Sequence, residues 1–281
     1  MVTCTNEIKG TGKMKLIMMA VIAALAAMAW SATPQTRAEK VNERIRKNLD
    51  GVPRFSRMWN PGYTKVWTLE YLFGKDSELV DYTNRCNCLK AAFAAAVHDN
   101  DAPFAACVLM RIRREVKGFS RNTEERFVER AISTAGFVDY GESLFRERFR
   151  DDLEKCSSAG GYASVRMQAI RLKPFIIRPP TTLAEAVQLL NKKSVAADYV
   201  NGGMGARFEL ELSDADKEPP MLPRVEVGCH IANGEVESYD VTLEEAVRTV
   251  AESVGYTFNV GANGVVTVAR ARGPNARRDR N

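Results

Sequence analysis

The chain of 281 residues carries the pattern Thr-Leu-x-Glu-Ala-Val twice, at 182–187 and at 242–247. In each copy a threonine is followed three residues later by a glutamate, which is the spacing of a capping box. The threonine hydroxyl accepts from the glutamate's backbone N–H, and the glutamate carboxylate accepts from the threonine's backbone N–H. Apolar residues then recur at helical spacing. The pattern therefore predicts two amphipathic helices, each burying one stripe.

The stretches that flank these helices alternate apolar and polar residues, which predicts β-strands. We expect strands at 173–178, 206–212, 224–231, 256–260 and 265–269, and Gly261–Gly264 has the composition of a hairpin turn. The predicted order is β-α-β-β-α-β-β over 173–270, an α+β domain with helices on one face of a small sheet. Six matched positions leave open whether the chain holds two copies of a strand–helix–strand unit or one unit and a second segment that only resembles it.

Residues 33–172 are rich in Ala, Arg, Glu and Leu and predict a helical domain of about five helices joined by short loops. Helix starts are expected at Asp101–Pro103, at Asn122 with Glu125, and at Asp139 with Glu142. Two more helices are expected at 36–49 and 77–99. Residues 54–67 hold Pro, Gly and aromatic residues, which predicts an irregular, packed connection.

Residues 1–32 have the organisation of a signal peptide. Lys13 and Lys15 precede an apolar run at 16–29, shorter than the about 20 residues of a membrane span. Small residues at 27–32 offer a cleavage site, and Met14 is an alternative start. An uncleaved anchor is the other interpretation. We expect an exported protein of the periplasm or cell envelope, with a mature chain that does not span the membrane.

Charge is unevenly distributed. Residues 33–172 carry 24 Lys/Arg against 19 Asp/Glu, residues 173–270 carry 9 against 14, and the tail 271–281, expected to be disordered, carries four Arg and one Asp. Arginine clusters at 111–114 and 146–150 raise the alternative of an anionic-surface or nucleic-acid binder. Solvated helix faces paired with nearby Glu are the more common explanation, so no nucleic-acid partner is expected.

Catalytic, metal and cofactor signals are weak in this sequence. The two histidines, His98 and His230, have no companions at metal-ligand spacing. Five cysteines follow the predicted signal peptide, at 86, 88, 107, 156 and 229, and their pairing cannot be deduced from sequence. We expect mostly buried free thiols, no metal, no cofactor and no Ser-His-Asp site. Carboxylate chemistry by Asp139 with Glu142 remains an alternative.

Residues 173–270 resemble the short N-terminal domain of secretins and TonB-dependent receptors, in the style of exported Planctomycetes and Verrucomicrobia proteins. Positions of the T-L-x-E-A pattern and of the following G-h-x-h strand carry the resemblance: Thr242, Leu243, Glu245, Ala246, Val247, Val250, Gly255, Tyr256 and Phe258. It implies a docking or signalling module of the envelope, without catalysis. The chain departs from the family pattern in two places. Neither a β-barrel nor a secretin core follows Ala269, and residues 198–205 form an insertion.

These observations predict an exported, non-enzymatic interaction or assembly module of the cell envelope, linked to secretion or transport machinery through a protein partner. The expected contact surface is an open sheet edge formed by the last strand, with Val265, Val266, Thr267 and Val268 pairing a partner strand. The alternative is an envelope hydrolase or ligand-binding protein with a site where the two domains meet.

Overall fold

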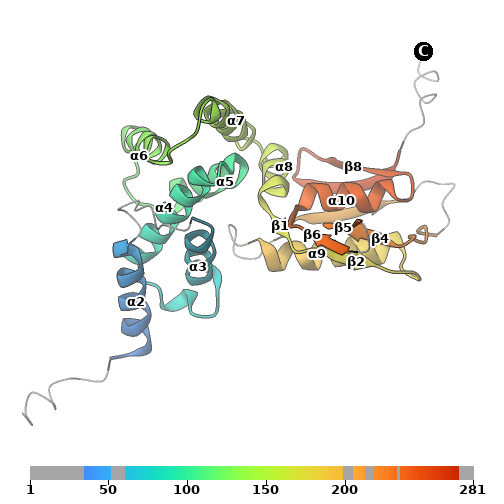
Figure 1. Cartoon of the computed structure of the whole chain (residues 1–281), viewed down its shortest axis with the longest axis horizontal. Helices are drawn as coiled ribbons and strands as arrows, with labels where there is room; N and C mark the ends of the chain where they lie inside the picture. The colour runs from blue at the N-terminus through green and yellow to red at the C-terminus, as the bar shows by residue number, and fades with distance from the viewer. Residues whose placement is uncertain (1–34, 52–60, 199–204, 213–217, 233–234, 272–281) are drawn as a thin grey trace, which may run out of the picture.

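The computed structural model describes residues 35–51, 61–198, 205–212, 218–232 and 235–271. It is α+β, with a helical N-terminal region followed by small sheets and two further helices, which confirms the predicted fold class (Figure 1). The predicted signal peptide at 1–32 and all but the first residue of the 271–281 tail lie outside the described residues.

The helical region holds more elements than the sequence predicts. Its α-helices are α2 (Arg37–Gly51), α3 (Pro61–Phe73), α4 (Tyr82–His98), α5 (Ala102–Glu115), α6 (Arg121–Thr134), α7 (Gly141–Lys155) and α8 (Ala159–Ala169), with a 3-10 turn η1 at Ser77–Leu79. The expected irregular stretch is helical from Pro61 onward, since Pro61 opens α3 at a position where a missing N–H costs nothing. The single helix expected at 77–99 is divided, because Asp81 caps a new helix by accepting from the backbone N–H of Asn84.

Two helix starts differ from the expected ones. Ser120 caps α6 by accepting from the N–H of Thr123, so Asn122 and Glu125 lie inside the helix. Helix α7 starts after Tyr140 without a side-chain cap, and Asp139 adopts a left-handed conformation with φ of +52°. The expected start at Asp101–Pro103 is confirmed, with Asp101 capping α5 through the N–H of Phe104.

Two hydrophobic cores divide the molecule, and α8 contributes to both. Val165 and Ala169 pack in the helical core, whereas Met167 packs in the second core together with Ile170 and Leu172. The second core therefore begins upstream of residue 173. Figure 1 shows α8 standing between the helical region and the α+β region.

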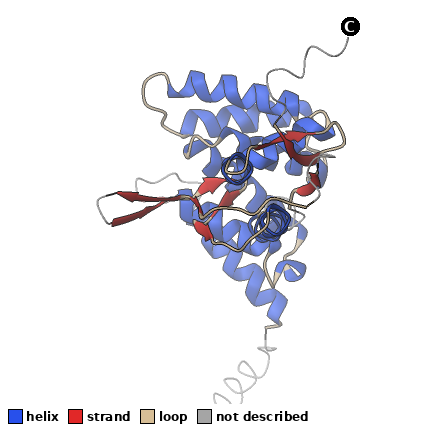
Figure 2. Cartoon of the chain, turned by 90° about the vertical axis from the view of Figure 1, so that its right-hand side faces the viewer, coloured by secondary structure: helices blue, strands red, loops and turns tan. Residues whose placement is uncertain are grey.

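The described residues of the second region form four small sheets built from short strands. The strands are β1 (Arg171–Leu172), β2 (Phe175–Ile177), β3 (Arg207–Glu211), β4 (Val225–Val227), β5 (Cys229–Ala232), β6 (Glu235–Ser238), β7 (Val241–Thr242), β8 (Tyr256–Val260) and β9 (Val265–Arg270). The predicted strand at 224–231 is broken at Gly228, which has φ of +68° and lies so close to the Tyr239 carbonyl that a Cβ would clash. The hairpin β5–β6 projects from the domain, and α9 (Leu183–Ala197) and α10 (Leu243–Glu252) are seen end-on beside each other (Figure 2).

The repeated sequence corresponds to a repeated structure with pseudo-twofold pairing. Thr242 at the start of α10 bridges Arg171, and Thr182 at the start of α9 bridges Met221. In both copies the following leucine donates its N–H to the carbonyl just before the bridging residue: Leu243 to Ile170 at 2.9 Å and Leu183 to Pro220 at 2.8 Å. Strands β2 and β4 pair antiparallel in the register such a twofold requires, Phe175 with Val227 and Ile177 with Val225.

The same relation extends to the three-stranded sheet. Gly205 and Gly255, both with positive φ, precede β3 and β8, and these strands run in opposite directions on the two sides of β9. The predicted open edge at 265–269 is therefore wrong. Strand β9 is central, with β3 parallel to it on one side and β8 antiparallel to it on the other. The strands β3 and β8, which follow the two repeated helices, both take their hydrogen bonds from β9.

Candidate functional site

The predicted contact residues lie in the middle of a sheet and not on a free edge. Val266 and Val268 are buried in the second core, Val265 is buried on the other face, and Thr267 is only partly exposed. Their backbone groups already pair with β3 and β8. A partner strand cannot add to β9 without displacing one of its neighbours, so these four residues do not form a site in the described structure.

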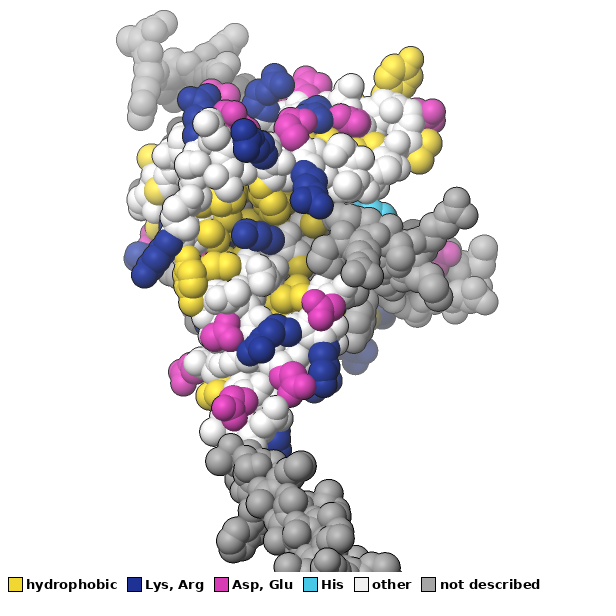
Figure 3. All heavy atoms as spheres, turned by 90° about the vertical axis from the view of Figure 1, so that its left-hand side faces the viewer, with side chains coloured by type: hydrophobic (Ala, Val, Ile, Leu, Met, Phe, Trp, Pro, Cys, Tyr) yellow, Lys and Arg dark blue, Asp and Glu magenta, His cyan; other side chains and the backbone are white. Residues whose placement is uncertain are grey.

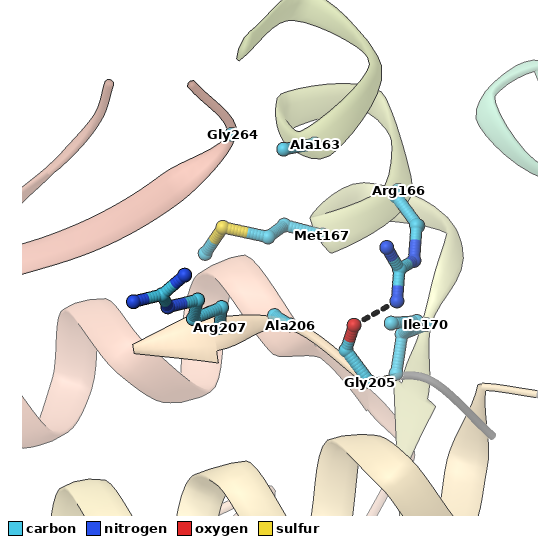
Figure 4. A pocket seen from close by; sticks show the side chains of 8 residues that line it. All are labelled: Ala163, Arg166, Met167, Ile170, Gly205, Ala206, Arg207 and Gly264. Carbon is cyan, nitrogen blue, oxygen red and sulfur yellow. Dashed lines mark hydrogen bonds between the residues drawn. The ribbon is translucent and has the colours of Figure 1, made fainter. Parts of the chain in front are cut away.

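A hollow of about 160 Å³ lies where the two regions meet, the place expected for the alternative enzyme or ligand site. Figure 4 shows Met167 and Arg166 of α8 facing Gly205, Ala206 and Arg207, with Gly264 of the β8–β9 turn on the opposite side. Its volume is below the ~300 Å³ at which small-molecule pockets begin. The hollow can admit a few water molecules but does not enclose a substrate.

The charged group inside this junction is already neutralised. Arg166 donates from Nε and Nη2 to Asp198 Oδ2 at 3.0 and 2.5 Å, and Nη2 also donates to the Gly205 carbonyl (Figure 4). The same carboxylate oxygen accepts from the Gly205 N–H at 3.1 Å. These contacts join the two ends of the predicted 198–205 insertion to α8. Arg166 therefore has a structural role, since it connects α8 to this segment. Residues 199–204 lie outside the described residues.

The other predicted candidates do not converge on a catalytic arrangement. Glu142 pairs with Arg146, and Asp139 lies outside α7 on an exposed turn. In the arginine clusters, Arg111 pairs with Glu115, Arg113 with Glu124, and Arg146 with Glu129 as well as Glu142. Three of the six arginines in these clusters are thus paired within the helical region, as expected for solvated helix faces.

The cysteines in the described structure are free thiols, and four of the five are buried. Burial raises the pKa of Cys88 to about 12 and that of Cys156 to about 11, and it raises the pKa of Cys107 well above its usual value. A thiol with a raised pKa holds its proton at neutral pH and is a poor nucleophile. Within the described residues, no three His, Cys, Asp or Glu side chains gather closely enough to hold a metal.

The most apolar hollow described is a groove of about 410 Å³ on the helical region. We call it the α2–α4–α6 groove. It is lined by Leu49, Asp50, Asn87, Lys90, Ala91, Ala94, Phe127, Arg130, Ala131 and Thr134. Figure 3 shows an apolar hollow surrounded by Lys, Arg, Asp and Glu on this side of the molecule.

Small side chains create the groove and an aromatic pair shapes its wall. Ala91 and Ala94 of α4 and Ala131 of α6 form the floor, where larger residues would fill the space between the helices. Phe127 forms a wall, and its ring lies 5.0 Å from that of the fully buried Phe93, measured between centroids. This aromatic contact holds Phe127 in place, so the groove does not depend on a partner for its shape.

The rim of the groove carries charge without a partner in the described part of the chain. Lys90 and Arg130 form no ion pair with any described residue, whereas the arginines of the neighbouring helix faces do. Asp50 at the end of α2 is the one acidic group among the described residues that line the groove. An apolar floor flanked by two available cations favours a ligand with an apolar side and a carboxylate.

The groove has no complete signature in the sequence, because its residues come from three helices whose packing no local pattern predicts. The alanine run in 91–96 was the available signal, since it leaves one face of α4 without large side chains. None of the helices in the described part of the chain combines the length and apolarity that a membrane span needs. Comparison of the chain with protein-family models, with curated proteins and with solved structures gives no match.

Proposed function

We propose that this protein is an exported, non-enzymatic interaction or assembly subunit of the cell envelope, and that it binds its partner in the α2–α4–α6 groove. The location rests on the signal-peptide pattern at 1–32, and a link to secretion or transport machinery rests on the family resemblance of 173–270. The observation that carries the proposal is the preformed apolar groove with two cations that form no ion pair with any described residue.

The occupant that fits is a short amphipathic segment of a partner protein. Its apolar side chains pack on Ala91, Ala94 and Phe127, and a carboxylate on its edge pairs with Lys90 or Arg130. Helices present such residues at i, i+3, i+4 and i+7, which is the usual way an amphipathic helix is held in a groove. Because the ion pairs lie at the rim, they determine specificity and association rate more than affinity.

The test is selection of binding peptides from a displayed library of helical segments, with the mature chain as bait. The expected binders carry apolar residues at helical spacing and an acidic residue beside them. Ala94→Leu fills the groove and is expected to abolish binding. Lys90→Glu is expected to weaken binding about tenfold, and a peptide with Lys in place of its acidic residue is expected to bind this variant better than the original peptide does.

Lys192→Glu provides the matched control, because Lys192 is an exposed lysine on α9 in the other region. It makes the same change in net charge as Lys90→Glu and is expected to leave binding unchanged. Selected peptides that bind the Ala94→Leu variant as well as the original chain would show that the groove is not the contact surface.

A further inference from the structure

Asp152 is a buried carboxylate that the proposed function does not use. It lies in the last turn of α7 and is only 1% exposed. Its Oδ2 atom has no hydrogen-bond partner among the described residues. Its Oδ1 accepts only a long contact of 3.3 Å from Lys155 Nζ. Buried polar atoms in proteins are nearly always paired, so an orphan carboxylate oxygen needs an explanation.

Asp152 lines a hollow of about 440 Å³ that is separate from the α2–α4–α6 groove. The other lining residues are Asn100, Leu144, Glu147, Arg148, Asp151, Lys155 and Gln168. Three carboxylates therefore face two cations. The hollow also lies beside the C-terminal ends of α4 at His98 and of α7 at Lys155, where the helix dipoles add negative potential. Leu144 supplies an apolar wall and is itself largely exposed.

We propose that this hollow binds a primary ammonium group, with Asp152 as its anchor. An ammonium has three N–H donors and no acceptor. Asp152 Oδ2 is buried in this structure, so the Asp152 side chain turns toward the hollow to accept from the ligand, which can then reach a second oxygen on Glu147, Asp151, Asn100 or Gln168. Charge-assisted bonds of this kind are about twice as strong as neutral ones. The ligand class is a small amine or a lysine side chain, whose methylene stem can lie along Leu144.

Lys155 already contacts the carboxylate that the ligand would bind, but this contact is weak. Its side chain is 53% exposed and reaches Asp152 from three residues along the same helix. A contact at 3.3 Å lies beyond the usual range of charge-assisted bonds, ~2.7–2.9 Å. The ammonium of a ligand therefore competes with the ammonium of Lys155 for one carboxylate. Removing Lys155 should strengthen ligand binding, and removing the charge of Asp152 should weaken it.

The experiment is an NMR titration of the mature chain with 1,5-diaminopentane, with Nα-acetyl-lysine amide as a second probe and 1,5-pentanediol as the uncharged control. We expect saturable shifts for an amine and none for the diol. Asp152→Asn is expected to weaken binding at least about tenfold, and Lys155→Gln to strengthen it a few-fold. Glu154→Gln, at an exposed carboxylate on α7 that does not line the hollow, is expected to change affinity by less than about threefold.

The variants are expected to fold. Burial raises the pKa of Asp152, so its ionised form opposes folding near neutral pH, and replacing it with a neutral amide removes that cost. The backbone spectrum of each variant checks this directly. Binding by acetyl-lysine amide alone would identify a peptide side chain as the ligand. Failure of both amines to saturate in the millimolar range, or equal binding by the folded Asp152→Asn variant, would overturn the proposal without affecting the groove.

Discussion

Arg166 illustrates how a residue that looks functional can be structural. A largely buried arginine at a domain junction could serve as an anion site, but here the fully buried Asp198 accepts two of its hydrogen bonds and the Gly205 carbonyl accepts a third. Sequence patterns did not identify either residue, because the pair lies 32 positions apart and joins two regions. Such contacts depend on tertiary packing and have no periodic signature.

Removing Arg166 is expected to destabilise the chain strongly. Arg166→Ala removes the arginine counter-charge of the buried Asp198 carboxylate, which typically costs about 3–5 kcal/mol. The double variant Arg166→Met with Asp198→Asn removes both charges and is expected to be more stable than Arg166→Ala alone. Urea unfolding measures both changes in free energy.

Arg207→Ala is the control for this prediction, because Arg207 lines the same hollow but is exposed and pairs on the surface with Glu209. Its expected effect is within about 0.5 kcal/mol. An Arg166→Ala variant that is no less stable than Arg207→Ala would show that the buried pair does not hold the junction together.

At the scale of elements, prediction succeeded where a local rule determines the structure. Both capping boxes are present, with Thr182 and Thr242 accepting from the N–H groups of Glu185 and Glu245. Helices marked by a capping residue and apolar spacing were found close to their observed limits. The errors came where pairing partners are distant. Strand β9 has the pattern of any half-buried strand, and only its two neighbours show that it is central.

The two capping boxes are expected to contribute equally to stability. Their hydrogen bonds agree closely: Thr182 and Thr242 each donate a backbone N–H to their glutamate at 2.8 Å. Thr182→Ala and Thr242→Ala should each cost about 1 kcal/mol. Gln188→Ala, an exposed position inside α9, is the control and should be near neutral. Unequal costs measured by denaturation would contradict the structural equivalence of the repeats.

The first of these caps also predicts a dependence on pH. The backbone N–H of Thr182 donates to Glu185 and lowers the pKa of that carboxyl below its ordinary value of 4.5. The folded state therefore binds the proton less readily than the unfolded state. The contribution of the cap is complete above the ordinary pKa and is lost as the pH falls through the lowered one.

At the scale of the whole molecule, the two cores meet on one helix. Val165 and Ala169 of α8 belong to the helical core, while Met167 belongs to the second core with Ile170 and Leu172. The β1–β7 pairing and the Leu243 bond to Ile170 also depend on residues before 173. The boundary near residue 173 that the change in composition predicts therefore does not separate the two cores.

Two fragments of the C-terminal region test this shared helix. A fragment of residues 173–271 lacks Met167, Ile170 and Leu172, all of them buried, and each lost large apolar side chain removes about 1.5–3 kcal/mol of burial. Because small domains are stable by only about 5–15 kcal/mol, this fragment is expected to be largely unfolded. A fragment of residues 159–271 keeps α8 and β1 and is expected to fold, although it exposes Val165 and Ala169. Circular dichroism and NMR dispersion distinguish these outcomes. A folded 173–271 fragment would mean that α8 is only a connector, and that the pseudo-twofold repeat is stable without the bridge at Arg171.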